Sequence, residues 1–214
     1  MSLTLHSHPL SSFCQKVLTG LYELDLPFRQ QIVDLSDAEQ RAALVGRWPL
    51  AQFPVLTDDA RGVTLPETSI ILEYVEQQYR ARGALLPVDA ERALTCRLRD
   101  RFFDLYVNVP MGKIVTDKLR PPGQNDAFGV REARAKLEAA YAIADGWLAG
   151  STWAVGDTFT LADCAAAPAL FYAGQVVPFA QHENLKGYYA RLVARPSFAR
   201  VLREAEPYLA MFPG

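Results

Sequence analysis

Hydrophobic positions in the first eighty residues alternate between two spacings. Leu3 and Leu5, two residues apart, predict a short strand over 2–6. Residues 14–24 then show apolar positions at helical spacing, which predicts a helix. These positions are Val17, Leu18, Leu21 and Leu24.

The pattern continues with further strands and helices up to residue 79. We expect a second strand over 28–35, a hairpin with strands over 54–56 and 63–65, and a helix that ends near Tyr79. Ser36 and Glu39 have the spacing of a capping box, so a helix is expected between the second strand and the hairpin, up to about Val45. The order β-α-β-α-β-β-α indicates a mixed sheet with helices on both faces.

After Tyr79 the pattern changes. The stretch "RARGALLPVD" has the glycine, proline and charge of a linker. Everything beyond it is typical of helices, with two apolar stripes separated by "RPPGQND". The first stripe is Leu94, Leu98, Phe102, Leu105 and Val109, and the second is Val130, Leu137, Tyr141, Ala144 and Leu148. We therefore predict an α/β domain over 1–80, a linker over 81–88 and an all-α domain over 89–214.

Composition and charge narrow the partners. Half of the residues are hydrophobic, so the chain can bury a sizeable core. The formal net charge is only -2, which gives no general reason to expect nucleic acid as a partner. A local group of arginines is interleaved with acidic residues, as on a solvated helix face. This group is Arg92, Arg97, Arg99 and Arg101.

The cysteines and the apolar runs indicate the compartment. The three cysteines stand far apart, which matches neither a disulfide framework nor a zinc site, so we expect no metal. The N-terminus lacks the apolar core of a signal peptide, and no apolar run approaches the ~20 residues of a membrane span. We expect a soluble cytoplasmic protein with no membrane partner.

Three short segments carry the candidate chemistry. Ser11 and Ser12 stand just before the first helix, where backbone N–H groups favour an anion such as a thiolate. Taken alone, either serine is more typical of a helix cap, and no serine-histidine-aspartate spacing supports a nucleophile. The Phe53-Pro54 bond precedes a hairpin strand, although only about 5–6% of such bonds are cis. Glu67 and Thr68 begin a helix and could form a second anion site.

Together with two later segments, these features resemble the cytosolic glutathione transferases. "SSFC" resembles the serine-type active-site turn of the theta and zeta classes, "QFPVL" the cis-proline segment, and "LPETSIILEYV" the γ-glutamyl segment. "GDTFTLADC", with Thr160 and Asp163 as a capping box, and "LKGYYARLVARPSF" resemble the later helices. The resemblance implies a thioredoxin-like domain followed by an all-helical domain.

The resemblance also implies roles for the site residues. Ser11, or less typically Ser12, would donate a hydrogen bond to the glutathione sulfur. Phe53, with Pro54 cis, would contact the cysteinyl part. Further expected glutathione contacts are Gln52, Glu67 and Thr68. Trp48 and Ala51 stand where the family often has asparagine and glycine, and Gln52 where it often has lysine, so the contact to the glycine carboxylate could be weaker.

The implied reaction is conjugation of glutathione, as cosubstrate, to a hydrophobic electrophile, with a homodimer as the expected assembly. The pocket for the electrophile would be lined by residues of the helical domain. The candidates are Tyr106, Met111, Val115, Phe171, Tyr172 and Phe212. The alternatives are an isomerase of the maleylacetoacetate type, a glutathione-dependent reductase that uses Cys14, and a non-catalytic binding protein on the same fold. An inward cysteine one turn into a helix is more typical of a core residue.

Overall fold

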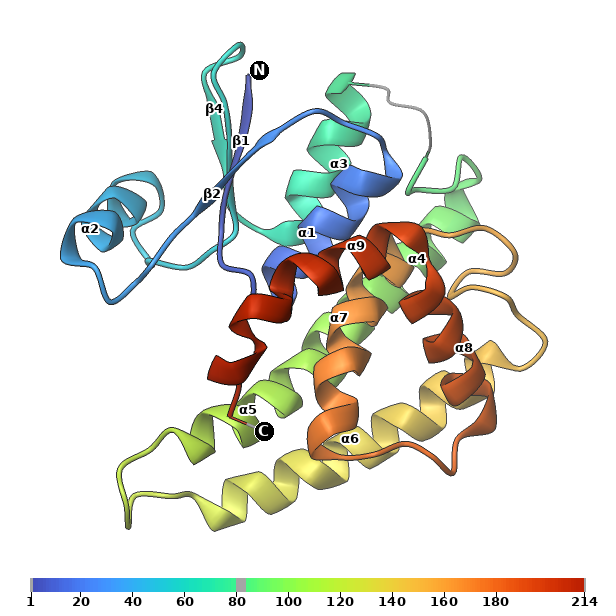
Figure 1. Ribbon diagram of the computed structural model, residues 1–214. Coiled ribbons are helices and arrows are strands. Elements are labelled where there is room, and N and C mark those ends of the chain that lie inside the picture. Colours follow the sequence, from blue (N-terminus) through green and yellow to red (C-terminus); the bar gives the residue numbers. More distant parts are fainter. Residues whose placement is uncertain (1, 80–83, 214) are drawn as a thin grey trace.

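The first part of the chain forms the predicted α/β unit (Figure 1). The computed structural model describes residues 2–79 and 84–213. The elements of this unit are β1 (Leu3–Ser7), α1 (Ser12–Glu23), β2 (Arg29–Ile32), α2 (Ala38–Arg47), β3 (Val55–Asp58), β4 (Val63–Leu65) and α3 (Thr68–Tyr79). The predicted order of strands and helices is confirmed.

The sheet is mixed and has the strand order β2-β1-β3-β4. β1 pairs with β2 in parallel and with β3 in antiparallel orientation, and β3 and β4 form the predicted hairpin. The inner strand β1 is buried along its whole length. Figure 1 shows α1 and α3 on one side of the sheet and α2 on the other, as expected for an α/β sandwich.

The start of α2 differs from the prediction. Asp37, not Ser36, is the N-cap, and its carboxylate accepts hydrogen bonds from the backbone N–H groups of Glu39 and Gln40. The Ser36 hydroxyl instead donates to Asp34 at 2.7 Å. Serine and aspartate are both good N-caps. The sequence alone therefore did not decide between Ser36 and Asp37 as the first residue before the helix.

The second part is helical, as predicted. Its elements are α4 (Ala90–Phe102), the π-helical turn η1 (Phe103–Asn108), α5 (Val109–Lys118), α6 (Ala127–Leu148), α7 (Leu161–Val176), α8 (Glu183–Ala194), α9 (Pro196–Ala205) and the 3-10 turn η2 (Glu206–Met211). Two isolated β-bridges lie in the loop before α7. Of the predicted linker, residues 81–83 lie outside the described residues, so the domain boundaries stay a prediction.

Helix α7 lies at the centre of the helical part and begins with the predicted capping box. The Asp163 carboxylate accepts from the backbone N–H and the hydroxyl of Thr160, and it also accepts from the Ala154 N–H and the Tyr188 hydroxyl. Asp163 is fully buried. Four donors therefore satisfy a carboxylate that would otherwise be costly to bury.

The two predicted apolar stripes have different positions. The second packs inward on α6, where only Val130 is partly exposed. The first lies mostly on the outside, because Leu94 is 69% and Leu98 61% exposed and only Phe102 is buried. The inner face of α4 and η1 instead carries Asp100 and Asp104.

These two aspartates meet a buried lysine from the α/β unit. The Lys16 ammonium lies 2.6 Å from Asp100 Oδ1 and 2.7 Å from Asp104 Oδ2, and it donates to Ser69 Oγ at 2.9 Å. Arg101 forms further ion pairs with both aspartates. The cluster of Lys16, Ser69, Asp100, Arg101 and Asp104 therefore joins α1, α3 and α4 with balanced charge. We call it the interdomain ion cluster.

Replacing Lys16 by methionine should destabilise the protein strongly. Asp100 and Asp104 would keep their burial and lose their main cation, and breaking a buried pair in this way costs about 3–5 kcal/mol. The matched control is Lys186→Met, which removes an exposed pair with Glu183 and should cost at most about 1 kcal/mol. Urea unfolding measures both, and similar losses for the two variants would contradict this role of Lys16.

Candidate functional site

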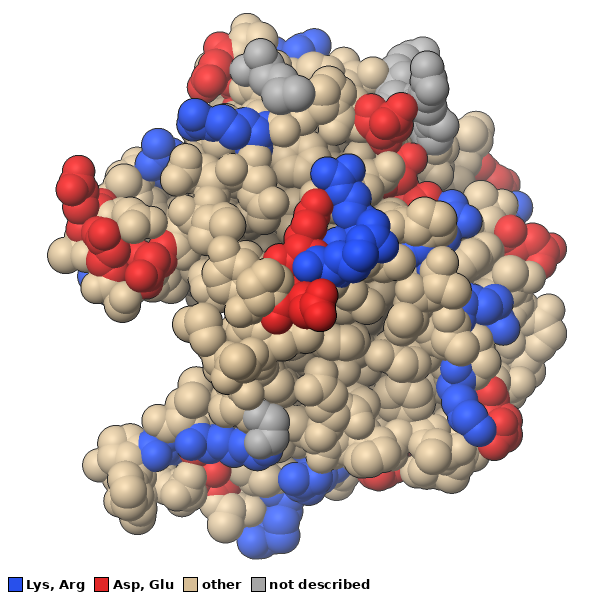
Figure 2. All heavy atoms as spheres, in the orientation of Figure 1, with Lys and Arg blue, Asp and Glu red and all other residues tan. Residues whose placement is uncertain are grey.

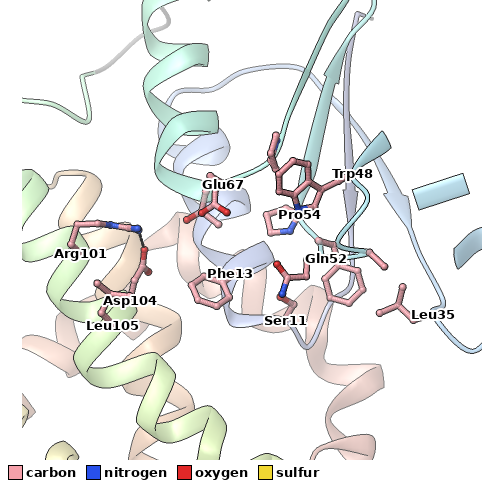
Figure 3. A pocket seen from close by; sticks show the side chains of 14 residues that line it. Ser11, Phe13, Leu35, Trp48, Gln52, Pro54, Glu67, Arg101, Asp104 and Leu105 are labelled. Atoms are coloured by element: carbon pink, nitrogen blue, oxygen red, sulfur yellow. Dashed lines mark hydrogen bonds and ion pairs between the residues drawn. The ribbon is translucent and has the colours of Figure 1, made fainter. Parts of the chain in front are cut away.

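A cavity of about 420 Å³ lies where the start of α1, the segment before β3, the start of α3 and helix α4 with η1 come together. The space-filling view shows the molecule deeply hollowed on one side, between α2 and the far ends of α5 and α6 (Figure 2). Figure 3 shows the side chains that line the cavity. They are Ser11, Phe13, Leu35, Trp48, Ala51, Gln52, Phe53, Pro54, Pro66, Glu67, Thr68, Arg101, Asp104 and Leu105.

Ser11 is the N-cap of α1 and also lines the cavity. Its hydroxyl oxygen accepts a hydrogen bond from the Cys14 backbone N–H at 3.3 Å, and its own backbone N–H donates to the His8 carbonyl at 3.0 Å. An accepting hydroxyl keeps its proton, so Ser11 can cap the helix and still donate to a ligand. Ser12 is the first residue of the helix and is not among the described lining residues.

The segment before β3 forms a second wall. The Phe53-Pro54 peptide bond is cis, as the resemblance implied, and Ala51 has a positive φ of 54°. The Phe53 side chain packs with Trp48 against the small core of Val33, Leu44 and Val55. This packing fixes the segment that brings Gln52, Phe53 and Pro54 to the cavity.

Glu67 and Thr68 form a third wall at the start of α3. Glu67 has a φ of 69°, a left-handed backbone conformation that is uncommon outside glycine. Thr68 follows as the first residue of the helix and is buried. The structure therefore brings together Ser11 and the five expected glutathione contacts, all of which line one cavity.

Sequence reasoning missed Arg101 and Asp104, which come from the helical part. Both line the cavity and belong to the interdomain ion cluster. Burial raises the pKa of the Asp104 carboxyl, although Lys16 opposes this shift. The sequence did show alternating basic and acidic residues over 97–104. It could not show that Asp100 and Asp104 are the ones that face the interior.

The residues expected around the electrophile are dispersed. None of them is among the described residues that line the cavity. Tyr106 is exposed, Val115 is partly buried, and Met111 and Tyr172 are buried in the helical part. Phe171 and Phe212 line a separate cavity of about 740 Å³ between α7, α8 and η2.

Cys14 is close to the cavity in sequence but not part of its wall. Its side chain is fully buried, and its sulfur accepts a hydrogen bond from the His8 backbone N–H at 3.4 Å. Burial raises the pKa of this thiol to about 12. Such a thiol stays protonated at neutral pH and is a poor nucleophile.

Neither a metal site nor a membrane-spanning helix is found among the described residues. Within 2–79 and 84–213, no three histidine, cysteine or acidic side chains are placed to hold a metal ion. Within the same ranges, no helix combines the length and the apolar character needed to cross a membrane.

Comparisons with known proteins identify the family. Residues 5–83 match the family model described as the glutathione S-transferase N-terminal domain, and residues 100–196 match the C-terminal domain. Glutathione S-transferase GstB of Escherichia coli is 27% identical over 94% of this chain and 97% of its own. FtsZ-localized protein A of Caulobacter vibrioides is 31% identical over 97% of this chain and 93% of its own.

A solved structure agrees with these matches. The glutathione S-transferase from Methylobacillus flagellatus with glutathione bound has a TM-score of 0.85 and 26% identity, and the match covers 94% of this chain and 98% of that one. Both family models match in order and together cover most of the chain. The chain therefore belongs to the glutathione S-transferase family.

Proposed function

We propose that Ser11 stabilises the glutathione thiolate and that this thiolate attacks a hydrophobic electrophile. The chain is a glutathione transferase, and glutathione is its cosubstrate. The observation that carries the role of Ser11 is its position as helix N-cap on the wall of the cavity. The N-terminus of α1 and the serine hydroxyl then act on the same sulfur.

The physical task of the site is to ionise a thiol. A free thiol has a pKa near ~8.5, and the thiolate is the reactive form. The positive end of the α1 dipole favours the anion, and a hydroxyl donor stabilises it further. The nucleophile belongs to the bound glutathione, so Ser11 itself forms no covalent bond.

The remaining walls suggest how glutathione lies. The Phe53 backbone, beside cis-Pro54, can pair with the cysteinyl backbone of the ligand. Glu67 and the start of α3 at Thr68 can receive the γ-glutamyl group, whose amine and carboxylate suit an acidic side chain and a helix N-terminus. Gln52 is then available at the glycine end.

The electrophile would meet the sulfur beside Phe13 and Leu105, two apolar residues of the cavity wall. These side chains favour a hydrophobic acceptor. A glutathione-assisted isomerisation would use the same thiolate and the same Ser11, so it remains the alternative reaction for this site.

Ser11→Ala should lower kcat/KM for conjugation of glutathione to chlorodinitrobenzene. Loss of one donor to a developing anion typically costs about 10²–10³ in rate. The pH profile should also move to higher pH, because the bound thiol would ionise less readily. Stopped-flow or steady-state absorbance measures both effects.

Ser12→Ala is the matched control, since it lies next to Ser11 but outside the described wall of the cavity. It should change kcat/KM little. Full activity of Ser11→Ala, together with a large loss in Ser12→Ala, would transfer the role to Ser12. Full activity of both variants would contradict a serine-stabilised thiolate.

The reductase alternative depends on Cys14. Because Cys14 is fully buried and the pKa of its thiol is raised to about 12, iodoacetamide should modify it far more slowly at pH 8 than it modifies free glutathione. Mass spectrometry of the native protein, with urea-unfolded protein as control, measures this rate. Rapid labelling of native Cys14, with loss of activity in Cys14→Ala, would support the reductase.

We also propose that the protein is a homodimer that covers the outward stripe on α4. Leu94 and Leu98 are exposed there, and Ile70 on α3 is exposed as well. A contiguous exposed apolar patch on a folded protein marks an interaction site. The pair of Arg97 with Glu73 at 2.8 Å also joins α3 and α4 at the surface.

Leu98→Glu should shift the protein from dimer to monomer, because a carboxylate cannot be buried unpaired in an apolar contact. The matched control is Leu119→Glu at the end of α5, where the leucine is equally exposed but lies off the stripe. Sedimentation velocity measures the mass of each variant. A monomeric wild type, or a dimer in Leu98→Glu, would argue against this interface.

A further inference from the structure

We propose that a cavity between α2 and the sheet is a second ligand site, which binds a small anion of the phosphate class and fastens α2 to β2. This cavity has a volume of about 220 Å³, about half that of the cavity that Ser11 lines. The two cavities share none of their described lining residues. The proposal therefore does not depend on the proposed function.

Strand alternation and helical spacing build the wall of this cavity. Leu5 faces the core on the side of α1 and α3, so its neighbour His6 faces α2 on the other side of the sheet (Figure 1). Gln31 on the edge strand β2 pairs with His6, and Arg29, two residues earlier, points to the same face. The other described lining residues are Ile32 and Val33, and, from one face of α2, Gln40, Ala43, Leu44 and Arg47.

The charges of this wall are all positive. Among the described lining residues, Arg29 and Arg47 are charged and none is acidic. Burial lowers the pKa of His6 to about 4, and the nearby guanidiniums of Arg47 and Arg29 add to this shift. Asp59 acts in the opposite direction. The imidazole is therefore neutral near neutral pH, and the cavity keeps the two positive charges of its arginines.

Both arginines have N–H donors to spare. Within 2–79 and 84–213, the Arg29 side chain has no hydrogen-bond or ion-pair partner. Arg47 donates from Nη1 to the Ala43 carbonyl at 2.7 Å, which leaves its Nε and Nη2 groups for a ligand. Two guanidiniums without a counter-charge repel each other. A bound anion would remove this repulsion and gain charge-assisted hydrogen bonds from both groups.

The donor set favours phosphate over a carboxylate. A guanidinium offers its donors as a planar fork that fits the oxygens of either group. A phosphate has three or more oxygens, so it can accept from both forks and still accept from the neutral His6 imidazole, which donates one hydrogen bond. A phosphate monoester also carries about -1.5 to -2 charge near neutral pH, which matches two arginines. The volume limits the ligand to a phosphate with a small organic part.

An anion at this site would attach α2 at a second point. The helix, all ten residues of which are described, buries only Leu44 against the sheet. Arg29 belongs to β2 and Arg47 to the last turn of α2, so an anion between them would bridge the two elements. Trp48 follows as the C-cap of α2 and lines the cavity that Ser11 lines. The bridge would therefore stabilise the helix end next to that cavity.

Titration of the wild-type protein with inorganic phosphate tests the site, at constant ionic strength and near neutral pH. The NMR signals of the three histidines report where the anion binds. We expect a saturable change of the His6 signal, and none for His8 and His182, which lie outside the described wall of this cavity. An unchanged His6 signal would overturn the proposal.

Two further ligands define the class of anion. Glycerol 2-phosphate separates a phosphate monoester from the free ion, since the one that binds more tightly identifies the source. Succinate is a dianion with two carboxylates and should bind more weakly than either phosphate. Tighter binding of succinate would overturn the assignment to the phosphate class.

Variants test the two arginines. Arg29→Ala and Arg47→Ala should each weaken phosphate binding about tenfold or more, as expected for hydrogen bonds to a charged group. Arg47→Lys should restore part of the affinity. Arg41→Ala is the matched control, because Arg41 is an exposed arginine of the same helix outside the described wall, and its Kd should equal that of the wild type. Arg29 and Arg47 are also exposed, so both variants should fold, which circular dichroism checks.

Amide hydrogen exchange tests the bridge to α2. Saturating phosphate should slow exchange in α2 of the wild type and of Arg41→Ala, but not of Arg47→Ala. Wild-type affinity in Arg29→Ala and Arg47→Ala would overturn the site. Phosphate binding without slower exchange in α2 would overturn its role in fastening the helix.

Discussion

Lys16 places an ammonium group between two buried carboxylates, and the arrangement of the site depends on this contact. It comes from α1, one turn after Ser11, whereas Asp100 and Asp104 come from α4 and η1. A buried charge without a partner is costly, so the α/β and helical parts are held in one relative position. That position brings Asp104 and Arg101 to the cavity that Ser11 lines.

The same contact explains the surface of α4. α4 and the following turn η1 direct Asp100 and Asp104 inward to Lys16, so the α4 leucines at 94 and 98 point outward. One helix therefore supplies charge to the cavity on one face and an apolar stripe to the proposed dimer contact on another. The candidate site and the proposed dimer contact therefore both depend on the orientation of a single helix.

Local patterns predicted most of the fold, and long-range contacts account for what they missed. The strand and helix order, the hairpin and the Thr160–Asp163 capping box depend on neighbouring residues, and the structure confirms them. The inward face of α4 could not be predicted, because apolar spacing favours the leucines, whereas the partner of Asp100 and Asp104 lies more than eighty residues earlier in the chain. The cap of α2 was missed for a smaller reason, since Ser36 and Asp37 are both good N-caps.

The candidate site was predictable on the side formed by the α/β unit. Ser11, Phe53, Pro54, Glu67 and Thr68 are close to turns and helix starts that the sequence marks, and all five line one cavity. The electrophile side depends on how helices pack, and the residues expected there are dispersed between the core, the surface and a second cavity.

We propose that Ser11 and the start of α1 make the bound thiol more acidic. Titration of the thiolate ultraviolet absorbance of bound glutathione tests it without an electrophile. In the wild type, the thiol should ionise well below its ordinary pKa of ~8.5, and Ser11→Ala should shift the transition back toward that value. The same pKa for glutathione bound to both proteins would contradict the account.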